Sequence, residues 1–102
     1  DSFLFDTSLN ASTNKDVILD FNPIDDTIRL DHTVFSQIAT GTLQASAFYV
    51  GTAAHDANDR IIYNRTTGEL TYDSNGNAAG GAVVFAVINN KANLTANDFF
   101  VI

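Results

Sequence analysis

The chain has 102 residues, of which 45% are hydrophobic and 11% aromatic, enough to fold around one modest core. Twelve acidic residues against five basic ones give a net charge of −7, which argues against nucleic acid and anionic lipid as partners. The absence of cysteine excludes disulfides, thiolate catalysis and cysteine-ligated zinc.

The start of the chain lacks the signals of a complete precursor. No basic leader with a small-residue cleavage site opens the sequence, and no methionine is present, so we expect a piece of a longer protein without a cleaved signal peptide. The longest apolar run, AVVFAVI at 82–88, is far shorter than a membrane span, so we expect no membrane-spanning segment. We treat residues 1–102 as a single, monomeric domain.

Apolar and polar residues alternate through the first third of the chain, which is typical of short, half-buried strands. Ile28 and Leu30, for example, are expected on one face of a strand and Arg29 on the other. Pro23 and its neighbouring aspartates favour a turn at 22–26. The expected strands lie at 2–6, 16–21 and 26–31.

The segment 32–40 changes the pattern, because Val34, Phe35 and Ile38 share a helical face that Asp31 is placed to cap. We predict one or two helical turns there. The clearest hairpin follows later, around the turn RTTG at 65–68. The other expected elements, in chain order, are a strand at 43–50, a polar loop at 52–59, hairpin strands at 60–64 and 69–73, a strand at 82–88 paired with the hairpin, and an apolar run at 95–102.

These patterns predict an all-β domain with about eight short strands and at most one short helix. Helical segments are too few to supply the crossovers that parallel strands usually need, so we expect a mainly antiparallel β-sandwich. The eight phenylalanines fall within apolar strand patterns, and core packing explains most of them.

The segment YDSNGNAAGGA at 72–82 places oxygen-bearing side chains at alternate positions of a turn-prone stretch. Asp73, Asn75 and Asn77 are therefore candidate ligands for calcium, which takes six to eight hard oxygens. Counted from Asp73, the chain has no glycine at the sixth position and no glutamate at the twelfth position, where an EF-hand loop carries them. Aspartate, asparagine and glycine also favour turns for backbone reasons alone, so a plain hairpin loop fits the same letters.

Asp16 and Asp20 form a second calcium candidate. Their four-residue spacing puts both carboxylates on one face of a strand that runs through 16–20. Two carboxylates on one side repel each other unless they are protonated, solvated or bridged by a cation. The alternative is a pair of solvated aspartates.

A third cluster, HDANDR at 55–60, contains His55, Asp56 and Asp59. It has no nucleophile in register with a His–Asp pair and too few ligands for zinc, so we interpret His55 and the isolated His32 as loop residues. No G-x-S-x-G, H-E-x-x-H or phosphate-loop motif occurs. We therefore expect no enzymatic activity.

Four segments, in order, resemble the region that follows the nonapeptide repeats of RTX proteins of the serralysin and hemolysin type. DSFLF at 1–5 is similar to the last nonapeptide, and DVILDFNPIDDTIRLD at 16–31 is similar to the segment after the repeats. The stretch 61–88 resembles the family's downstream hairpin, and LTANDFFVI at 94–102 resembles its C-terminal tail.

The resemblance implies a non-catalytic C-terminal domain that caps the calcium β-roll of a secreted, extracellular bacterial protein. Its implied partners are the upstream repeats and a type I secretion machinery, which reads an uncleaved signal at the C-terminus around Asp98. The resemblance also implies that Asp1, Asp16 and Asp20 share a calcium ion with the roll. The chain departs from the family pattern because it contains no complete Gly-Gly-x-Gly-x-Asp repeat, and because relatives often carry aspartate where Asn75 stands.

An extracellular β-sandwich binding module, of adhesin or carbohydrate-binding type, is the alternative function. Its contact surface would be the loops 52–59 and 73–81. Exposed tyrosines on a flat face would favour this alternative, and Tyr49, Tyr63 and Tyr72 are the candidates.

Overall fold

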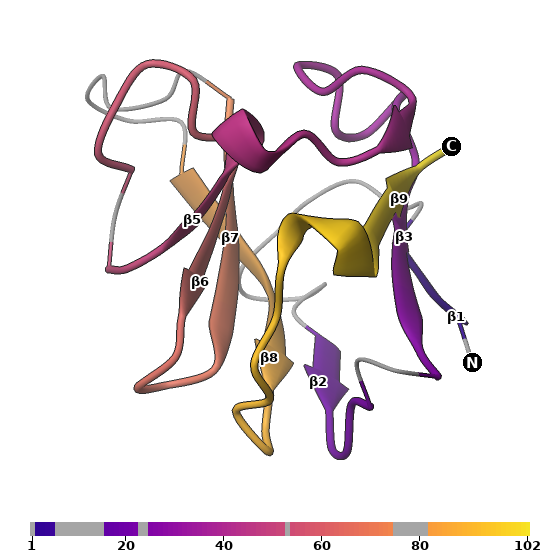
Figure 1. The fold of residues 1–102 in the computed structure, drawn as a ribbon, viewed down its shortest axis with the longest axis vertical. Coiled ribbons are helices and arrows are strands. Elements are labelled where there is room, and N and C mark those ends of the chain that lie inside the picture. The colour runs from indigo at the N-terminus through magenta and orange to yellow at the C-terminus, as the bar shows by residue number, and fades with distance from the viewer. Residues whose placement is uncertain (1, 6–15, 23–24, 53, 75–81) are drawn as a thin grey trace.

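A computed structural model describes residues 2–5, 16–22, 25–52, 54–74 and 82–102 (Figure 1). These residues form nine short strands and two single-turn 3₁₀ helices. The elements are β1 (Ser2–Phe5), β2 (Asp16–Ile18), β3 (Thr27–Leu30), β4 (Gly41–Thr42), η1 (Ala45–Ala47), β5 (Phe48–Val50), β6 (Ile61–Asn64), β7 (Glu69–Asp73), β8 (Ala82–Ile88), η2 (Ala96–Asp98) and β9 (Phe99–Val101). The predicted all-β class is confirmed.

The strands form two sheets that pack face to face. Sheet A has the strand order β1-β3-β9-β4, and sheet B has the order β2-β8-β7-β6-β5. Figure 1 shows β1, β3 and β9 on one side of the molecule and β5 to β8 on the other. Among the described residues, no helix is long and apolar enough to cross a membrane.

The expectation of mainly antiparallel sheets was wrong. Four of the seven strand pairings between described residues are parallel, namely β1–β3, β2–β8, β3–β9 and β5–β6. Parallel pairing needs a crossover, but here the crossover does not need a helix. Between β1 and β3 the chain passes through β2 in the opposite sheet, and between β3 and β9 it passes through all of β5 to β8.

Aromatic side chains from both sheets fill the space between them. Phe5 of β1 and Phe85 of β8 meet edge to face with ring centroids 5.1 Å apart, and Phe85 meets Phe35 in the same way at 5.1 Å. Phe35 in turn contacts the ring of Tyr72 at 5.0 Å, and Phe48 contacts Phe99 at 5.3 Å. Edge-to-face pairs of this kind add to the stabilisation that burial provides. Core packing therefore accounts for most phenylalanines, as predicted.

A β-bulge explains why β8 does not alternate cleanly. The pairing with β7 runs Leu70↔Ala86 and then Thr71↔Val84, so Phe85 has no residue opposite it. The extra residue changes the face to which the neighbouring side chains point, so the consecutive residues Phe85 and Ala86 are both fully buried. In β3, by contrast, the simple alternation holds, with Ile28 and Leu30 buried and Arg29 exposed.

The segment 32–40 forms consecutive turns rather than the predicted helix. Asp31 does cap the first turn, since its side chain accepts hydrogen bonds from the backbone N and the hydroxyl of Thr33 at 2.9 and 2.8 Å. Phe35 N donates to Asp31 O at 2.8 Å, but the pattern then breaks as Phe35 and Ile38 turn inward to the core. Packing of these two side chains outweighs the local helical preference.

The middle and the end of the chain also differ from expectation. The predicted strand at 43–50 is divided into β4, which lies in sheet A, the turn η1, and β5, which lies in sheet B. The C-terminal strand β9 lies between β3 and β4 inside sheet A, where Phe99 and Val101 are buried and Phe100 is exposed. The tail is thus part of the core, with the carbonyl of Ile102 accepting hydrogen bonds from His32.

Candidate functional site

The first predicted calcium segment begins at the end of β7. Asp73 is the last residue of that strand, its side chain is buried, and its backbone N donates to Arg60 O at 2.8 Å. Asn75 and Asn77 lie outside the described residues. A buried carboxylate at a strand end suits either a cation ligand or a hydrogen-bonded loop anchor.

The second predicted calcium segment lies around β2. This strand starts at Asp16 but ends at Ile18, and the chain bends at Leu19 and Asp20. Ile18 is buried, so a continued strand would have turned Asp20 toward the core; the bend leaves Asp20 exposed instead. The expectation that one strand carries both Asp16 and Asp20 was therefore wrong. Asp1 lies outside the described residues.

The two segments lie toward opposite ends of sheet B. On β8, Asp16 is opposite Ala86 and Asp73 is opposite Ala82. Four residues of strand span about 13 Å, and Asp20 lies further still along the direction of β2. No single ion can therefore contact Asp20 and Asp73 together.

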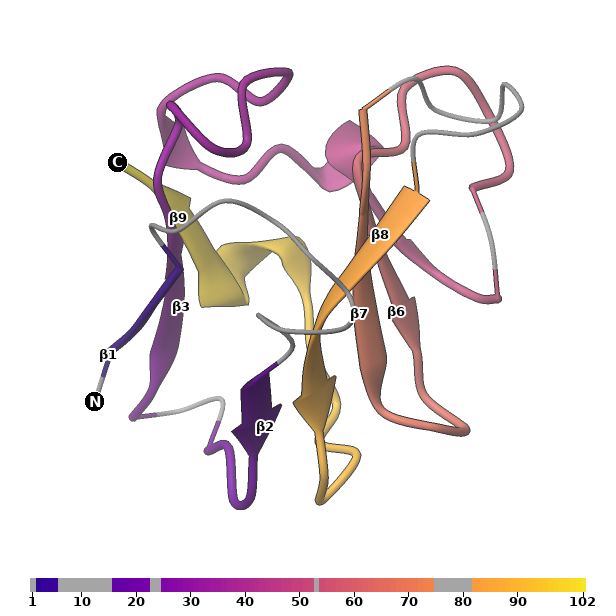
Figure 2. The same cartoon turned by 180° about the vertical axis from the view of Figure 1, so that it is seen from behind.

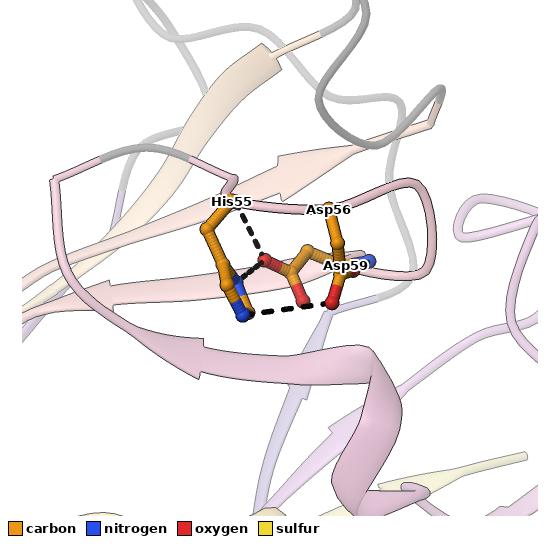
Figure 3. A group of neighbouring side chains, drawn as sticks. All are labelled: His55, Asp56 and Asp59. Carbon is orange, nitrogen blue, oxygen red and sulfur yellow. Dashed lines mark hydrogen bonds and ion pairs between the residues drawn. The ribbon is translucent and has the colours of Figure 1, made fainter.

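The third cluster forms a hydrogen-bonded network in the loop between β5 and β6 (Figure 3). The Asp59 carboxylate accepts hydrogen bonds from His55 N at 2.8 Å and from His55 Nδ1 at 2.5 Å, while Asp56 accepts from Asn58 N and Asp59 N. The imidazole of His55 stacks on the ring of Tyr49, with centroids 3.9 Å apart. Asp59 is 1% exposed and is the innermost member of the network.

This network locks the crossover loop in place. A histidine and two carboxylates are suitable ligand types for a divalent metal. However, His55 Nδ1 and Asp59 Oδ2 already bond to each other, and Asp56 Oδ1 is used by two backbone amides. The arrangement therefore satisfies a buried carboxylate and fixes the path from β5 to the parallel strand β6. Both histidines lie in loops, as predicted.

The network sets the pKa of Asp59. Burial raises the pKa of this carboxyl, but the hydrogen bonds from His55 N and His55 Nδ1 and the nearby imidazole lower it more, and the net shift is downward from 3.8. A lowered folded-state pKa means that the ionised carboxylate stabilises the fold. That stability is present above the unfolded pKa and is lost as the pH falls through the folded pKa.

Replacing Asp59 with asparagine is expected to lower the free energy of unfolding at pH 7 by about 1.5–3 kcal/mol, because charge-assisted hydrogen bonds are lost. The difference between the native chain and Asp59→Asn should shrink below about pH 4. Urea unfolding between pH 2 and pH 7 measures both. The matched control is Asp20→Asn, which removes an exposed carboxylate. Equal effects of the two substitutions would contradict the role of the network.

The three tyrosines do not form the exposed aromatic face that would favour the alternative function. Tyr63 and Tyr72 are buried in the core, and the Tyr63 hydroxyl donates to Ala92 O at 2.7 Å. Tyr49 is half-buried under His55. A pocket of about 260 Å³ does lie on the outer face of sheet B, with carboxylates of Glu69 and Asp73 among its walls.

The open edges of the two sheets are the remaining feature of functional interest. Within the described residues, β1 pairs only with β3 and β2 pairs only with β8, so each is the edge strand of its sheet. Phe5 of β1 contacts Phe85 of β8, and Phe3 contacts Phe21 just after β2, so the two edges belong to the same end of the sandwich. Both strands lie toward the viewer in Figure 2.

Sequence reasoning did not identify this pair of edges, because an edge is defined by pairing partners that lie far away in the chain. The nearest sequence signal is the apolar side chains in and beside these edge strands, namely Leu4 on β1, Val17 on β2 and Leu19 in the bend just after β2. Leu4, Val17 and Leu19 are 49%, 54% and 69% exposed. Apolar side chains on an uncovered edge strand are unusual in a protein that must avoid edge-to-edge association.

Over the described residues, the chain is a small all-β sandwich with two adjacent edges to which no described strand pairs, and with a hydrogen-bonded crossover loop. No family model matches the chain, and no curated protein or solved structure matches it.

Proposed function

We propose that this chain is a non-catalytic C-terminal domain that caps the calcium β-roll of a secreted bacterial RTX-type protein. The observation that carries the proposal is the path β1-β2-β3. The chain runs from sheet A to sheet B and back, and β3 then pairs in parallel with β1. A two-sheet parallel roll is wound in the same way, with each coil adding one strand to each sheet.

The edge strands β1 and β2 could each pair with one strand of such a coil. A preceding coil would add one strand beside β1 and one beside β2, continuing the parallel pairings that these strands make with β3 and β8. Exposed Leu4 and Val17 would then be covered by the neighbouring coil. A roll needs a cap of this kind because its last coil otherwise presents unpaired backbone groups.

At the opposite end the sandwich is closed differently. The edge strands there are β4, with two residues, and β5, with three residues. The segment η1 links them and runs across from sheet A to sheet B. Short, twisted edges discourage further strand addition. In sheet A the edge strand β4 has two residues against four in β1, whereas β5 and β2 in sheet B both have three. The shorter edge of sheet A therefore supports a domain that accepts coils at the β1 end.

Calcium enters the proposal through the junction with the repeats. Asp1 directly precedes β1 in the sequence, Asp16 begins β2, and Asp20 lies in the bend after β2, so acidic residues occur where the last calcium turns would meet the cap. Ions bound there would stabilise the folded state only where calcium is present. Folding of the joined repeats and cap would be disfavoured in a calcium-poor cytosol, which would keep the whole protein export-competent.

The proposed secretion signal at the C-terminus would be accessible in the unfolded chain. The strand β9 pairs between β3 and β4 and buries Phe99 and Val101 in the core, so the machinery would read the tail before β9 is incorporated into sheet A. Folding after export would then withdraw the signal. The proposed order is recognition of the tail, export, and calcium-driven folding.

An array of Gly-Gly-x-Gly-x-Asp repeats joined ahead of residue 1 tests the cap. The array should fold with a calcium midpoint about tenfold lower when this domain follows it than when it stands alone, because the cap removes the cost of an open end. The double substitution Leu4→Lys and Val17→Lys should abolish most of this lowering of the calcium midpoint, since charged edge strands resist pairing. Circular dichroism during a calcium titration measures the midpoint.

The double substitution Thr42→Lys and Val50→Lys is the matched control. These residues are exposed on β4 and β5, the opposite edges of the same two sheets. The control pair should leave the calcium midpoint unchanged. An array that folds at the same calcium concentration with and without the domain would refute the capping function, as would equal effects of the two lysine pairs.

A further inference from the structure

A polar pocket of about 270 Å³ lies at the end of the sandwich opposite β1 and β2. Its walls come from the turns before β4, from β4 and η1, and from the end of the crossover loop. Six of its polar lining residues are Gln37, Thr42, Gln44, Ser46, Asn58 and Arg60. Among the described residues that line it, none is acidic, which is notable in a chain with twelve acids and five bases.

Arg60 is the only charged residue among the described residues of this lining, and its position is fixed. Its backbone N donates to Ala47 O at 2.9 Å, and its Nη1 donates to the carbonyls of Ala57 and Asp59 at 2.8 and 3.0 Å. The guanidinium is therefore held by neutral carbonyls. Within the described part of the chain it makes no ion pair with a carboxylate.

The guanidinium also has unused hydrogen-bonding capacity. Nη1 is taken by the two carbonyls and Nε is buried without a hydrogen-bond partner among the described residues, so the donors open to the pocket are those of Nη2. A carboxylate pairs well with a guanidinium through charge-assisted hydrogen bonds, which are stronger than those between neutral groups.

We propose that this pocket binds a small organic carboxylate, with Arg60 as the anchor. The hydroxyls and amides of Thr42, Gln44, Ser46 and Asn58 supply neutral donors and acceptors around the rest of the ligand. A cation is disfavoured, because the lining holds one positive charge and no described negative charge. The volume suits a ligand of modest size, since it lies near the lower limit for small-molecule sites.

The pocket is separate from the proposed cap junction. Its lining includes residues of β4 and η1, whereas the junction uses β1 and β2 at the other end of both sheets. Ligand binding here can therefore be tested on the chain alone, and its result does not depend on the capping function.

Acetate titration of the isotope-labelled chain, followed through the arginine Nε–Hε signals, tests the proposal. The chain has three arginines, and Arg29 and Arg65 are exposed and act as internal controls. At constant ionic strength, the Arg60 signal should shift and saturate with a half-point of about 1–10 mM, whereas the other two should not. A shift of Arg60 with glucose but not with acetate would overturn the carboxylate assignment.

Two isosteric substitutions sharpen the test. Gln44→Glu places a carboxylate in the lining and should weaken acetate binding at least tenfold, about 1.4 kcal/mol, by repelling or replacing the ligand. Asn64→Asp adds the same charge in the β6–β7 hairpin, outside this lining, and should leave binding unchanged. A parallel, unsaturated drift of all three arginines, or no shift of Arg60, would refute the site.

Discussion

Replacing Phe85 with alanine is expected to lower the free energy of unfolding by about 3–5 kcal/mol. Phe85 is fully buried, and its ring meets Phe5 from sheet A and Phe35 from the turns after β3. Removing it leaves a cavity where both sheets and the loop segment meet, and the bulge in β8 fixes the backbone so that the site cannot collapse easily. Urea unfolding followed by circular dichroism measures the loss.

Phe100→Ala is the control for this substitution. Phe100 lies on β9 in the middle of sheet A but is 42% exposed on the outer face. The Phe100→Ala substitution should lower the free energy of unfolding by less than about 1.5 kcal/mol, since a partly buried side chain contributes proportionally less. If the two phenylalanines cost the same, the aromatic cluster would not be the centre of the core.

Gly68→Ala should destabilise the chain by about 2–4 kcal/mol, because two costs add. Gly68 has φ +84°, a conformation that costs an L-residue about 1–2 kcal/mol. A Cβ on Gly68 would also lie far inside van der Waals contact with the backbone carbonyl of Ile88. Relief of that clash must move the end of β8, where Ile88 N donates to Gly68 O at 2.7 Å. Urea unfolding of the variant beside the native chain measures the loss.

Gly41→Ala separates these two costs. Gly41 also has a positive φ, +106°, but a Cβ added there would have no atom within 4 Å. The variant should therefore lose about 1–2 kcal/mol from backbone strain alone. Thermal or urea unfolding of both variants gives the difference, and a Gly41 substitution as costly as the Gly68 substitution would show that the contact with Ile88 is unimportant.

Local patterns predicted most of the strands. The alternation of Ile28, Arg29 and Leu30 and the hairpin around Gly68 are both present, because each depends on neighbours within a few residues. The predicted class also holds, since the strands leave only two 3₁₀ turns between them in the described part of the chain. Local sequence therefore determines the elements of this fold well.

The pairing of the strands was not predictable in the same way. Parallel pairs such as β3–β9 join residues about 70 positions apart, and the chain makes the crossover through the other sheet rather than through a helix. The bulge at Phe85 and the division of 43–50 between two sheets also depend on packing across the core. No short-range pattern encodes these features.

The candidate sites show the same limit. The spacing of Asp16 and Asp20 suggested one strand face, but the burial of Ile18 favours a bend before Asp20. The His55–Asp59 hydrogen bond could be predicted from the sequence, because both residues lie in one short loop. The Arg60 pocket could not be predicted from the sequence, because its walls come from the segments 37–47 and 58–60, which only the fold brings together.

Amide hydrogen exchange on the array-joined chain tests the capping account most directly. With calcium, amides of β1 and β2 should exchange at least about tenfold more slowly than in the domain alone, since strand pairing protects edge amides. Amides of β5, the opposite edge of sheet B, should not change. Unchanged exchange in β1 and β2, or equal slowing in all edge strands, would contradict docking of the repeats on this end of the sandwich.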